Sequence, residues 1–223
     1  MTTSSYAVLG LLSIRPWSAY ELARQAARSL RFAWPKSERH LYTEPKKLVA
    51  IGYATASTEP SGAKRSRTVY EITDDGRHAL EEWATRAPSP PVFESEAMLR
   101  LLFAEVGSLD DLTAALRRLA SDADELRQWS SEIVAGYVSG DDLPFPDRVA
   151  QNTLLASFQL ELFALIERWV DFAAAEVDEW GTSSSPEAQS RALGLAAELA
   201  RGELPLDRRS GVDSRATDRP SSR

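Results

Sequence analysis

The sequence predicts a mainly α-helical protein of two domains. Its 223 residues, 43% hydrophobic and 26% charged, are typical of a soluble globular protein and allow one large or two small cores. Most segments carry apolar residues at helical spacing, and two short segments have the composition of β-strands. Three prolines among residues 88–91 mark a semi-rigid spacer, so we expect domains at 1–87 and 94–203, joined by a Pro-rich linker at 88–93.

The charge differs between the two halves. Residues 1–87 hold 13 Lys and Arg against 9 Asp and Glu, whereas residues 88–223 hold 13 against 24, which together give the net charge of −7. All four lysines lie in the first half: Lys36, Lys46, Lys47 and Lys64. This asymmetry indicates a nucleic-acid-binding domain joined to a domain that does not bind nucleic acid.

Two helices open the chain. Residues 4–12 form a short apolar helix that ends at Arg15-Pro16-Trp17. Ser18 and Glu21 have the spacing of a capping box, which predicts a second helix from there to about Leu30, with Tyr20 and Leu22 among its apolar members.

A third helix begins at Ser37, whose hydroxyl can cap the first turn. Leu41, Leu48 and Val49 recur at helical spacing and are expected to face inward. The opposite face carries cations and short hydrogen-bonding groups: Arg39, His40, Thr43, Lys46 and Lys47. Taken alone, this amphipathic pattern also fits plain core packing.

Two strands, residues 53–57 and 68–73, follow the third helix and enclose a basic segment with Lys64, Arg65 and Arg67. A basic loop alone is most often a solvated turn. Two helices followed by a hairpin with a cationic tip, however, predict a winged helix-turn-helix with a two-stranded wing. In that fold the third helix enters the major groove of DNA, and the wing contacts the backbone or the minor groove.

A fourth helix begins at Asp74, capped by Thr73, and ends near Ala87. A fifth is expected at residues 94–106. A long helix is expected from Ser108, and its sequence shows four heptad repeats. The residues at the repeating positions are Leu109, Leu112, Leu116, Leu119, Ala123, Leu126, Ser130, Ile133 and Tyr137. We interpret this seam as a dimerisation surface, with Leu109, Leu112, Leu116, Leu119, Leu126 and Ile133 as its core. A helical hairpin within one chain would use the same seam.

A second long helix is expected from Asp147 to Trp180. Its predicted apolar face is Leu154, Leu155, Phe158, Leu162, Leu165, Ile166, Trp169, Phe172, Val177 and Trp180. Its C-terminal end is acidic, and negative charge is unfavourable beside the negative end of the helix dipole. A neighbouring arginine would offset this charge. A short helix starts at Pro186, and residues 204–223 are expected to be disordered. We thus predict a C-terminal all-α dimerisation domain with long, coiled-coil-like helices.

Residues 4–87 resemble the PadR family of bacterial transcription regulators. The matching segments are YAVLGLLS, SAYELARQ, HLYTEPKKLVAIGYA and TVYEITDDGRHALEEW. The resemblance implies a homodimeric winged-helix repressor with a helical dimerisation region, and it places Tyr42 close to DNA. Two positions depart from the family pattern: Ala19 stands in place of a glycine, and Pro45 in place of a leucine, where it should bend the helix.

We therefore predict a dimeric, cytoplasmic, sequence-specific DNA-binding regulator that acts as a repressor on a near-palindromic operator. Its predicted DNA-binding residues are Ser37, Arg39, His40, Tyr42, Thr43, Lys46, Lys47, Lys64, Arg65 and Arg67. The alternative is a winged helix that binds protein, which would expose apolar residues on the third helix. Aromatic residues of the second half, such as Trp129, Phe158 and Trp169, either line a pocket for a small hydrophobic effector or are packed core.

The sequence gives little support for a catalytic activity. There is no cysteine, and both histidines, His40 and His78, lie in the predicted DNA-binding half. No nucleophile motif, phosphate-binding loop or metal-ligand spacing is present, so we expect no enzyme activity, no cofactor and no metal. The N-terminus lacks the features of a secretory signal, and no uninterrupted apolar run approaches the length of a membrane span.

Overall fold

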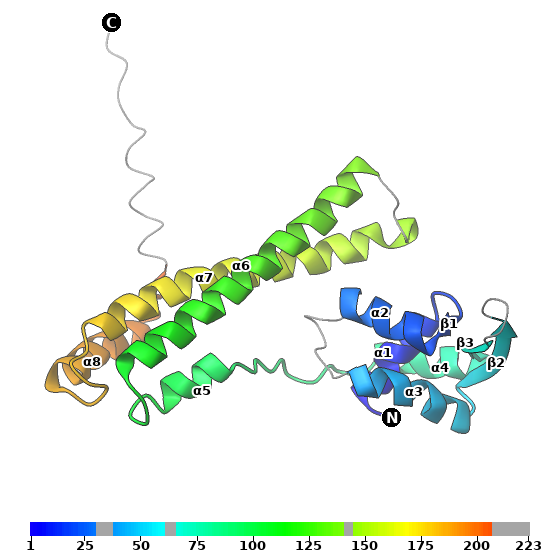
Figure 1. Ribbon diagram of the computed structural model, residues 1–223, viewed down its shortest axis with the longest axis horizontal. Coiled ribbons are helices and arrows are strands. Elements are labelled where there is room, and N and C mark those ends of the chain that lie inside the picture. Colours follow the sequence, from blue (N-terminus) through cyan, green and yellow to red (C-terminus); the bar gives the residue numbers. More distant parts are fainter. Residues whose placement is uncertain (30–37, 61–65, 141–144, 207–223) are drawn as a thin grey trace, which may run out of the picture. The chain divides into compact units, whose positions relative to one another are not determined.

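The computed structural model describes residues 1–29, 38–60, 66–140 and 145–206 (Figure 1). The chain divides into two compact units, Met1–Pro91 and Val92–Arg223. The boundary falls within the predicted linker at residues 88–93. The predicted disordered tail lies almost entirely outside the described residues.

The N-terminal unit contains four helices and a small sheet among the described residues. Its elements are α1 (Thr3–Leu12), β1 (Trp17–Ser18), α2 (Ala19–Ser29), α3 (Glu38–Ala50), β2 (Ala54–Pro60), β3 (Ser66–Ile72) and α4 (Asp74–Ala84). The sheet is antiparallel with strand order β1-β3-β2. The mainly α fold with a winged helix-turn-helix is therefore confirmed, and the wing hairpin gains a third strand that the sequence did not predict. A two-residue strand has no alternation to detect, so the sequence indicated only the end of the first helix at Trp17 and the capping box at Ser18.

Leucines from three helices form the core of this unit. Leu9, Leu12, Leu22 and Leu48 are almost completely buried. The Trp17 indole N–H donates to the Leu11 carbonyl at 2.7 Å and so fixes β1 against the end of α1. Burial of several leucines supplies the main driving force for packing the helices together.

Two of the three predicted helix caps of this unit lie within the described residues, and both are present, whereas Ser37 lies outside them. The Ser18 backbone N–H donates to the Glu21 carboxylate at 2.8 Å, and the Glu21 N–H donates to the Ser18 hydroxyl at 3.3 Å, which completes the capping box. The Thr73 hydroxyl accepts from Gly76 N–H at 3.1 Å and caps α4. Helix α3 runs without interruption through the buried Pro45.

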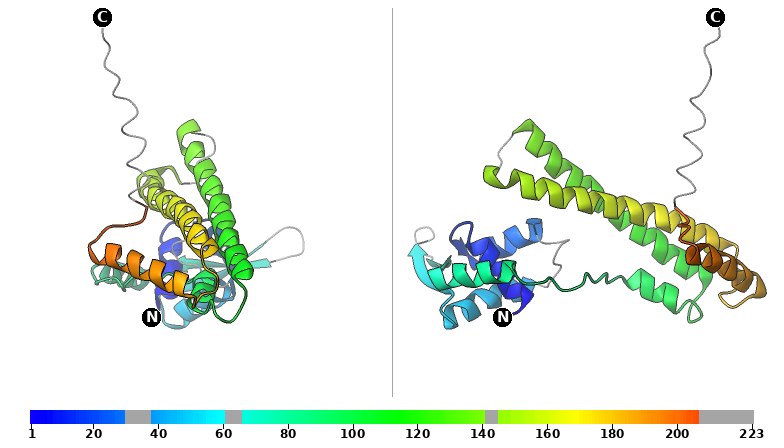
Figure 2. Two further views of the ribbon diagram at one scale, coloured as in Figure 1. Left: turned by 90° about the vertical axis from the view of Figure 1, so that its left-hand side faces the viewer. Right: turned by 180° about the vertical axis from the view of Figure 1, so that it is seen from behind.

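The C-terminal unit contains helices and no strands in its described part. It consists of α5 (Glu96–Leu102), α6 (Leu109–Ser139), the short 3-10 helix η1 (Pro146–Arg148), α7 (Val149–Asp178) and α8 (Pro186–Ala200). Figures 1 and 2 show α6 and α7 packed along each other as an antiparallel hairpin, with α8 beside the C-terminal part of α7.

The heptad seam of α6 packs against α7 of the same chain. Leu112 and Leu116 form a buried cluster with Val170, Ala173 and Val177, and Leu109 and Leu119 pack against it. Leu109, Leu112, Leu116 and Leu119 therefore pack as the helical hairpin within one chain that the sequence left as an alternative. Dimerisation through this seam, including Leu126 and Ile133, stays a prediction. A seam of this kind specifies that a second helix packs on it, but not which chain provides that helix.

The buried face of α7 differs in part from the predicted one: Val177 is buried as expected, and Ile166, Trp169 and Trp180 pack against the core cluster, but other positions differ. Ala156, Phe163, Val170 and Val177 are buried at intervals of seven residues. Leu154, Phe158 and Leu165, expected to face inward, are 74%, 65% and 44% exposed. Helix α7 carries two apolar stripes, and small residues of the narrower stripe allow α6 to approach closely. The sequence prediction selected the larger side chains of the other stripe as the buried face, because it was based on hydrophobicity alone.

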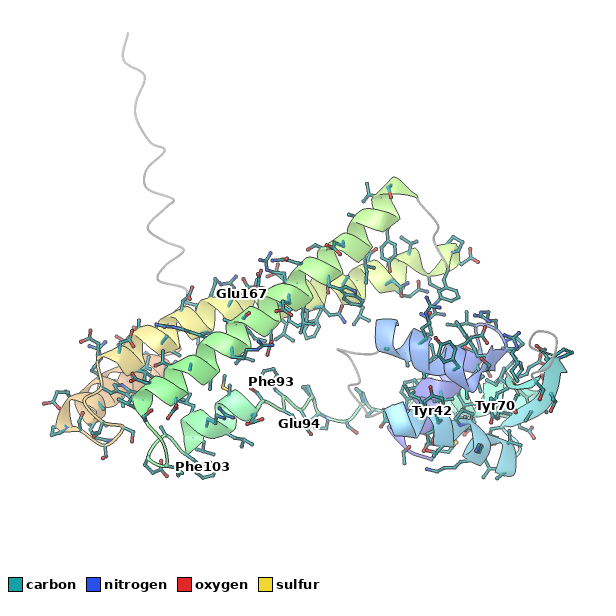
Figure 3. All side chains as sticks on the ribbon, viewed as in Figure 1. Tyr42, Tyr70, Phe93, Glu94, Phe103 and Glu167 are labelled. Carbon is teal, nitrogen blue, oxygen red and sulfur yellow. The ribbon has the colours of Figure 1, made fainter. Side chains whose placement is uncertain are left out.

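Arginines from neighbouring helices neutralise acidic groups of α7. Arg191 of α8 forms two hydrogen bonds with the Glu176 carboxylate, at 2.9 and 3.0 Å. This contact accounts for part of the acidic C-terminal end and raises the pKa of Arg191. Arg127 of α6 binds Glu167, labelled in Figure 3, at 2.7 Å and so crosses the hairpin.

Segment Pro146–Asp178 is long and apolar enough to cross a membrane, judged by length and composition alone. Long helices that carry much apolar surface in water-soluble proteins meet the same criterion. In this chain one stripe of α7 packs on α6, and the other is exposed. An exposed apolar stripe of this kind is typical of an interaction surface.

Replacing Ser130 by alanine is expected to stabilise the hairpin. Ser130 is 3% exposed in α6, and its hydroxyl has no hydrogen-bond partner among the described residues. Removing a buried, unsatisfied hydroxyl should raise the free energy of unfolding by about 1 kcal/mol. Urea unfolding of Ser130→Ala measures this change, and Ser131→Ala, at the exposed next position, controls for helix propensity. Equal stabilisation by both substitutions would contradict the expectation.

Candidate nucleic-acid interface

Helix α3 presents a polar outer face. Tyr42, Thr43, Lys46 and Lys47 are exposed, whereas Glu44, Pro45 and Leu48 are buried. Figure 3 labels Tyr42 on this helix, where its side chain is 41% exposed. The helical period thus separates the residues that pack on the unit from those that can meet a ligand. Cations, a hydroxyl and a phenol can bind phosphates and base edges.

Only part of the predicted DNA-binding site lies within the described residues. Ser37, Lys64 and Arg65 lie outside the described residues. Arg39 and His40 belong to the first turn of α3, and their side chains lie outside the described part. The predicted site residues whose side chains the structure describes are therefore Tyr42, Thr43, Lys46 and Lys47 on α3, and Arg67 in β3 of the wing.

The sequence predicted Lys47 as an outward-facing cation, but in the structure Lys47 also forms an ion pair with a buried residue. Its ammonium lies 2.6 Å from the carboxylate of the buried Glu44, although the lysine side chain is 65% exposed. Lysine and glutamate three residues apart are usually read as a surface pair. The sequence alone did not indicate that the glutamate is inside.

Arg67 joins the wing to α2. It lies in β3 opposite Glu59 of β2, and its guanidinium is 3.1 Å from the Glu59 carboxylate. It also lies 3.5 Å from the carboxylate of Glu21 in α2. Arg15 approaches the same Glu21 at 3.8 Å, and its guanidinium stacks over the Trp17 ring at 3.5 Å from the centroid. Arg67 is therefore engaged within the protein, and it orients the wing.

Glu21→Gln is expected to weaken this junction in a pH-dependent way. Hydrogen bonds from Ser18, followed by the charges of Arg67 and Arg15, hold the pKa of Glu21 below its ordinary value of 4.5. The carboxylate therefore stabilises the folded state above pH 4.5, and this contribution is lost as the pH falls through the lowered pKa. Glutamine keeps the capping-box geometry but lacks the charge.

Urea unfolding between pH 7 and pH 3 tests the Glu21 prediction. Wild type should be more stable than Glu21→Gln at pH 7, and the two should converge on acidification. A difference that is independent of pH would show that the charge of Glu21 does not stabilise the junction.

Tyr20 was predicted as one of the apolar members of the second helix, but it is 67% exposed in the first turn of α2. Leu22, Ala23 and Ala26 are the buried residues of that helix. Their helical phase turns position 20 away from the core, which is a signal that the sequence contained. The exposed phenol adds a hydrogen-bonding aromatic group at the start of α2.

The three aromatic residues proposed for an effector pocket are distributed along the hairpin. Trp129 and Trp169 are half-buried, and Trp169 packs against the α6–α7 core cluster. Phe158 is 65% exposed. An open cavity of about 340 Å³ lies instead between the start of α6 and the end of α7, where it is lined by Leu109, Thr113, Val177 and Trp180 among others. None of the three predicted residues lines it.

Comparison with known proteins matches the N-terminal unit to one family. Residues 8–82 match the model of the transcriptional regulator PadR-like family. The chain is 33% identical over 104 residues to the negative transcriptional regulator PadR of Bacillus subtilis, covering 46% of this chain and 57% of that protein. It is 29% identical over 85 residues to the probable transcriptional regulator Rv1176c of Mycobacterium tuberculosis, covering 38% and 45%. The chain thus matches about half the length of these curated relatives.

Solved structures share the fold over a longer part of the chain. Bacillus subtilis PadR in complex with operator DNA superposes with a TM-score of 0.68 and 24% identity, covering 79% of this chain and 98% of that one. The same protein in complex with p-coumaric acid gives a TM-score of 0.59 and 22% identity, covering 78% and 98%. The resemblance drawn from the four sequence segments is therefore confirmed. Residues 8–82 of this chain thus match the model of the PadR-like family of transcriptional regulators, and the chain shares the fold of the solved PadR structures.

Proposed function

We propose that the protein is a homodimeric, sequence-specific DNA-binding transcriptional regulator that acts as a repressor. The observation that carries this proposal is the outer face of α3, where Tyr42, Thr43, Lys46 and Lys47 are exposed on the helix that a winged helix-turn-helix places in the major groove. A protein-binding winged helix would present apolar side chains at these positions.

The division of charge supports DNA binding by the N-terminal unit. Residues 1–87 carry an excess of four cations over anions, whereas the rest of the chain is strongly acidic. Positive charge on one unit attracts the phosphate backbone, and the acidic unit opposes unspecific wrapping of DNA around the protein. Transcription regulation of this kind takes place in the cytoplasm of a bacterial cell and requires no catalytic group or cofactor.

The exposed stripe of α7 supports dimerisation. Leu154, Leu155, Phe158 and Leu165 are exposed by at least 37% along one side of the helix. Phe93 and Phe103, which flank α5 and are labelled in Figure 3, are also more than half exposed. A second copy would cover such surface, and paired recognition helices about 34 Å apart would meet successive major grooves of a near-palindromic operator.

A small aromatic effector is part of the proposal. Bacillus subtilis PadR has been crystallised with p-coumaric acid, and its structure shares the fold of this chain. Trp129, Phe158 and Trp169 are the aromatic residues that we propose as alternative contacts for such a ligand, at different places along the hairpin, and Phe158 lies in the exposed stripe that a second copy would cover. Binding there would couple ligand occupancy to the geometry of the dimer.

Fluorescence-anisotropy titration tests the proposed function. The full-length protein is titrated against labelled DNA from immediately upstream of its own gene and against a scrambled duplex, each at two salt concentrations. We expect tighter binding to the upstream DNA and a steep loss of affinity with salt, because phosphate contacts release counterions. If no duplex selected from a random library binds more tightly than scrambled DNA, the proposal is wrong, and a pull-down would then test the protein-binding alternative.

A further inference from the structure

A buried carboxylate connects the recognition helix to α1. The side chain of Glu44 in α3 is 3% exposed. Its Oε2 accepts a hydrogen bond from the Ser5 hydroxyl of α1 at 2.8 Å, and its Oε1 accepts one from the Lys47 ammonium at 2.6 Å. One side chain inside the unit therefore contacts both the neighbouring helix and a cation of the outer face.

The α1 side of this connection is well defined. Ser5 lies in the first turn of α1, where unpaired backbone N–H groups give the helix end a partial positive charge that favours a carboxylate. Ser5 and Thr2 exchange reciprocal capping hydrogen bonds at 3.2 and 3.3 Å, which restrict the Ser5 side chain. The Ser5–Glu44 bond therefore fixes how α3 is rotated against α1 more sharply than apolar packing, which tolerates small shifts.

Burial of the carboxylate also determines the position of Lys47. An ionised group inside a protein is costly unless it is paired and hydrogen-bonded, so Glu44 holds the ammonium strongly. The lysine side chain is nevertheless 65% exposed, and an ammonium carries three donors, of which Glu44 requires one. A lysine that is already ordered loses less conformational freedom when it binds a phosphate.

We propose that Glu44 is a positioning residue for DNA recognition: it holds the Lys47 ammonium at one place on the outer face of α3, where the ammonium binds a DNA phosphate in the specific complex. This inference rests on the proposed function. Phosphate contacts fix the register of a protein on DNA, so a displaced Lys47 would weaken the specific complex while its charge would still serve unspecific binding.

A purely electrostatic role of Glu44 predicts the opposite result. A carboxylate near the phosphate backbone repels it, and removal of that charge would strengthen binding to every DNA sequence. A purely structural role predicts lower stability with unchanged affinity of the folded protein. The ratio of affinities for specific and scrambled DNA separates the three roles.

The experiment uses the full-length protein and the tightest duplex selected from a random library. Affinities for this duplex and for scrambled DNA are measured at one salt concentration, and circular dichroism establishes the temperature at which each variant is folded. Glu44→Gln, which is isosteric, should lower the specificity ratio about tenfold, within the range of coupling between contacting residues. Ser5→Ala should lower it in the same direction without changing any charge near DNA.

Two further variants complete the test. Ser13→Ala removes a hydroxyl that donates to the Gly10 carbonyl at 2.8 Å just beyond the end of α1, and it should leave the ratio unchanged. In a Lys47→Met background, Glu44→Gln should have no effect on the ratio. Equal strengthening on both duplexes, an unchanged ratio, or an effect that persists without Lys47 would each overturn the inference. A wild type that selects no sequence would instead overturn the proposed function.

Discussion

Replacing Gly76 by alanine is expected to destabilise the N-terminal unit by about 3 kcal/mol or more. A Cβ at this position of α4 would lie 2.2 Å from the Tyr53 carbonyl oxygen and 2.9 Å from Cγ1 of Ile72. The same Tyr53 oxygen accepts a hydrogen bond from the Thr73 backbone N–H at 3.2 Å, so it cannot move away without breaking the junction between α4 and the wing. Only glycine allows this close approach of backbone to backbone.

Urea unfolding monitored by circular dichroism measures the effect of Gly76→Ala. Gly10→Ala is the matched control, because a Cβ at Gly10 in α1 meets nothing within 4 Å. Alanine should stabilise a helix at that position by about 0.5–1 kcal/mol. If the two substitutions had similar effects, the contact between Gly76 and the Tyr53 carbonyl would not restrict this position.

Phe158→Glu is expected to dissociate the proposed dimer and to weaken binding to a palindromic operator by roughly a hundredfold or more, because each half-site alone offers few contacts. Phe158 is 65% exposed in the single chain, so the substitution should leave the α6–α7 hairpin folded. Sedimentation reports the oligomeric state, and anisotropy reports the affinity.

Leu193→Glu provides a control for the dimer prediction. Leu193 is 72% exposed on α8, outside the α7 stripe, and its substitution should leave both the dimer and operator binding intact. Leu119→Asp, in contrast, should destabilise the hairpin itself, because Leu119 packs against the core cluster of its own chain. A Phe158→Glu variant that sediments as a dimer would remove this stripe from the interface.

Local signals in the sequence predicted the winged-helix domain well. Ser18 with Glu21, and Thr73 before α4, are short-range capping patterns whose hydrogen bonds involve residues three apart. Such contacts depend little on the rest of the fold, so the sequence is sufficient to find them. On α3, helical spacing correctly predicted that Leu48 is buried and that Thr43, Lys46 and Lys47 face outward.

Features that depend on distant residues were not predicted. The sequence could not show that Glu44 is buried, because its partner Ser5 lies 39 residues earlier. The seam of α6 was assigned to a second chain because a heptad pattern does not identify its partner. On α7, small residues such as Ala156 and Ala173 form the buried stripe, and only the packing distance to α6 distinguishes them from the larger exposed side chains.

The hairpin of α6 and α7 also has a consequence for the order of folding. Its two helices are joined by a short connection, and the cluster around Leu116 and Val170 is formed within one chain. Contacts of this kind can form quickly and at a rate that does not depend on protein concentration. Each newly made chain would then complete its hairpin first, and assembly would be the docking of two finished surfaces rather than folding in the presence of a partner. Refolding should accordingly show a helix-forming phase independent of concentration, followed by a slower second-order phase.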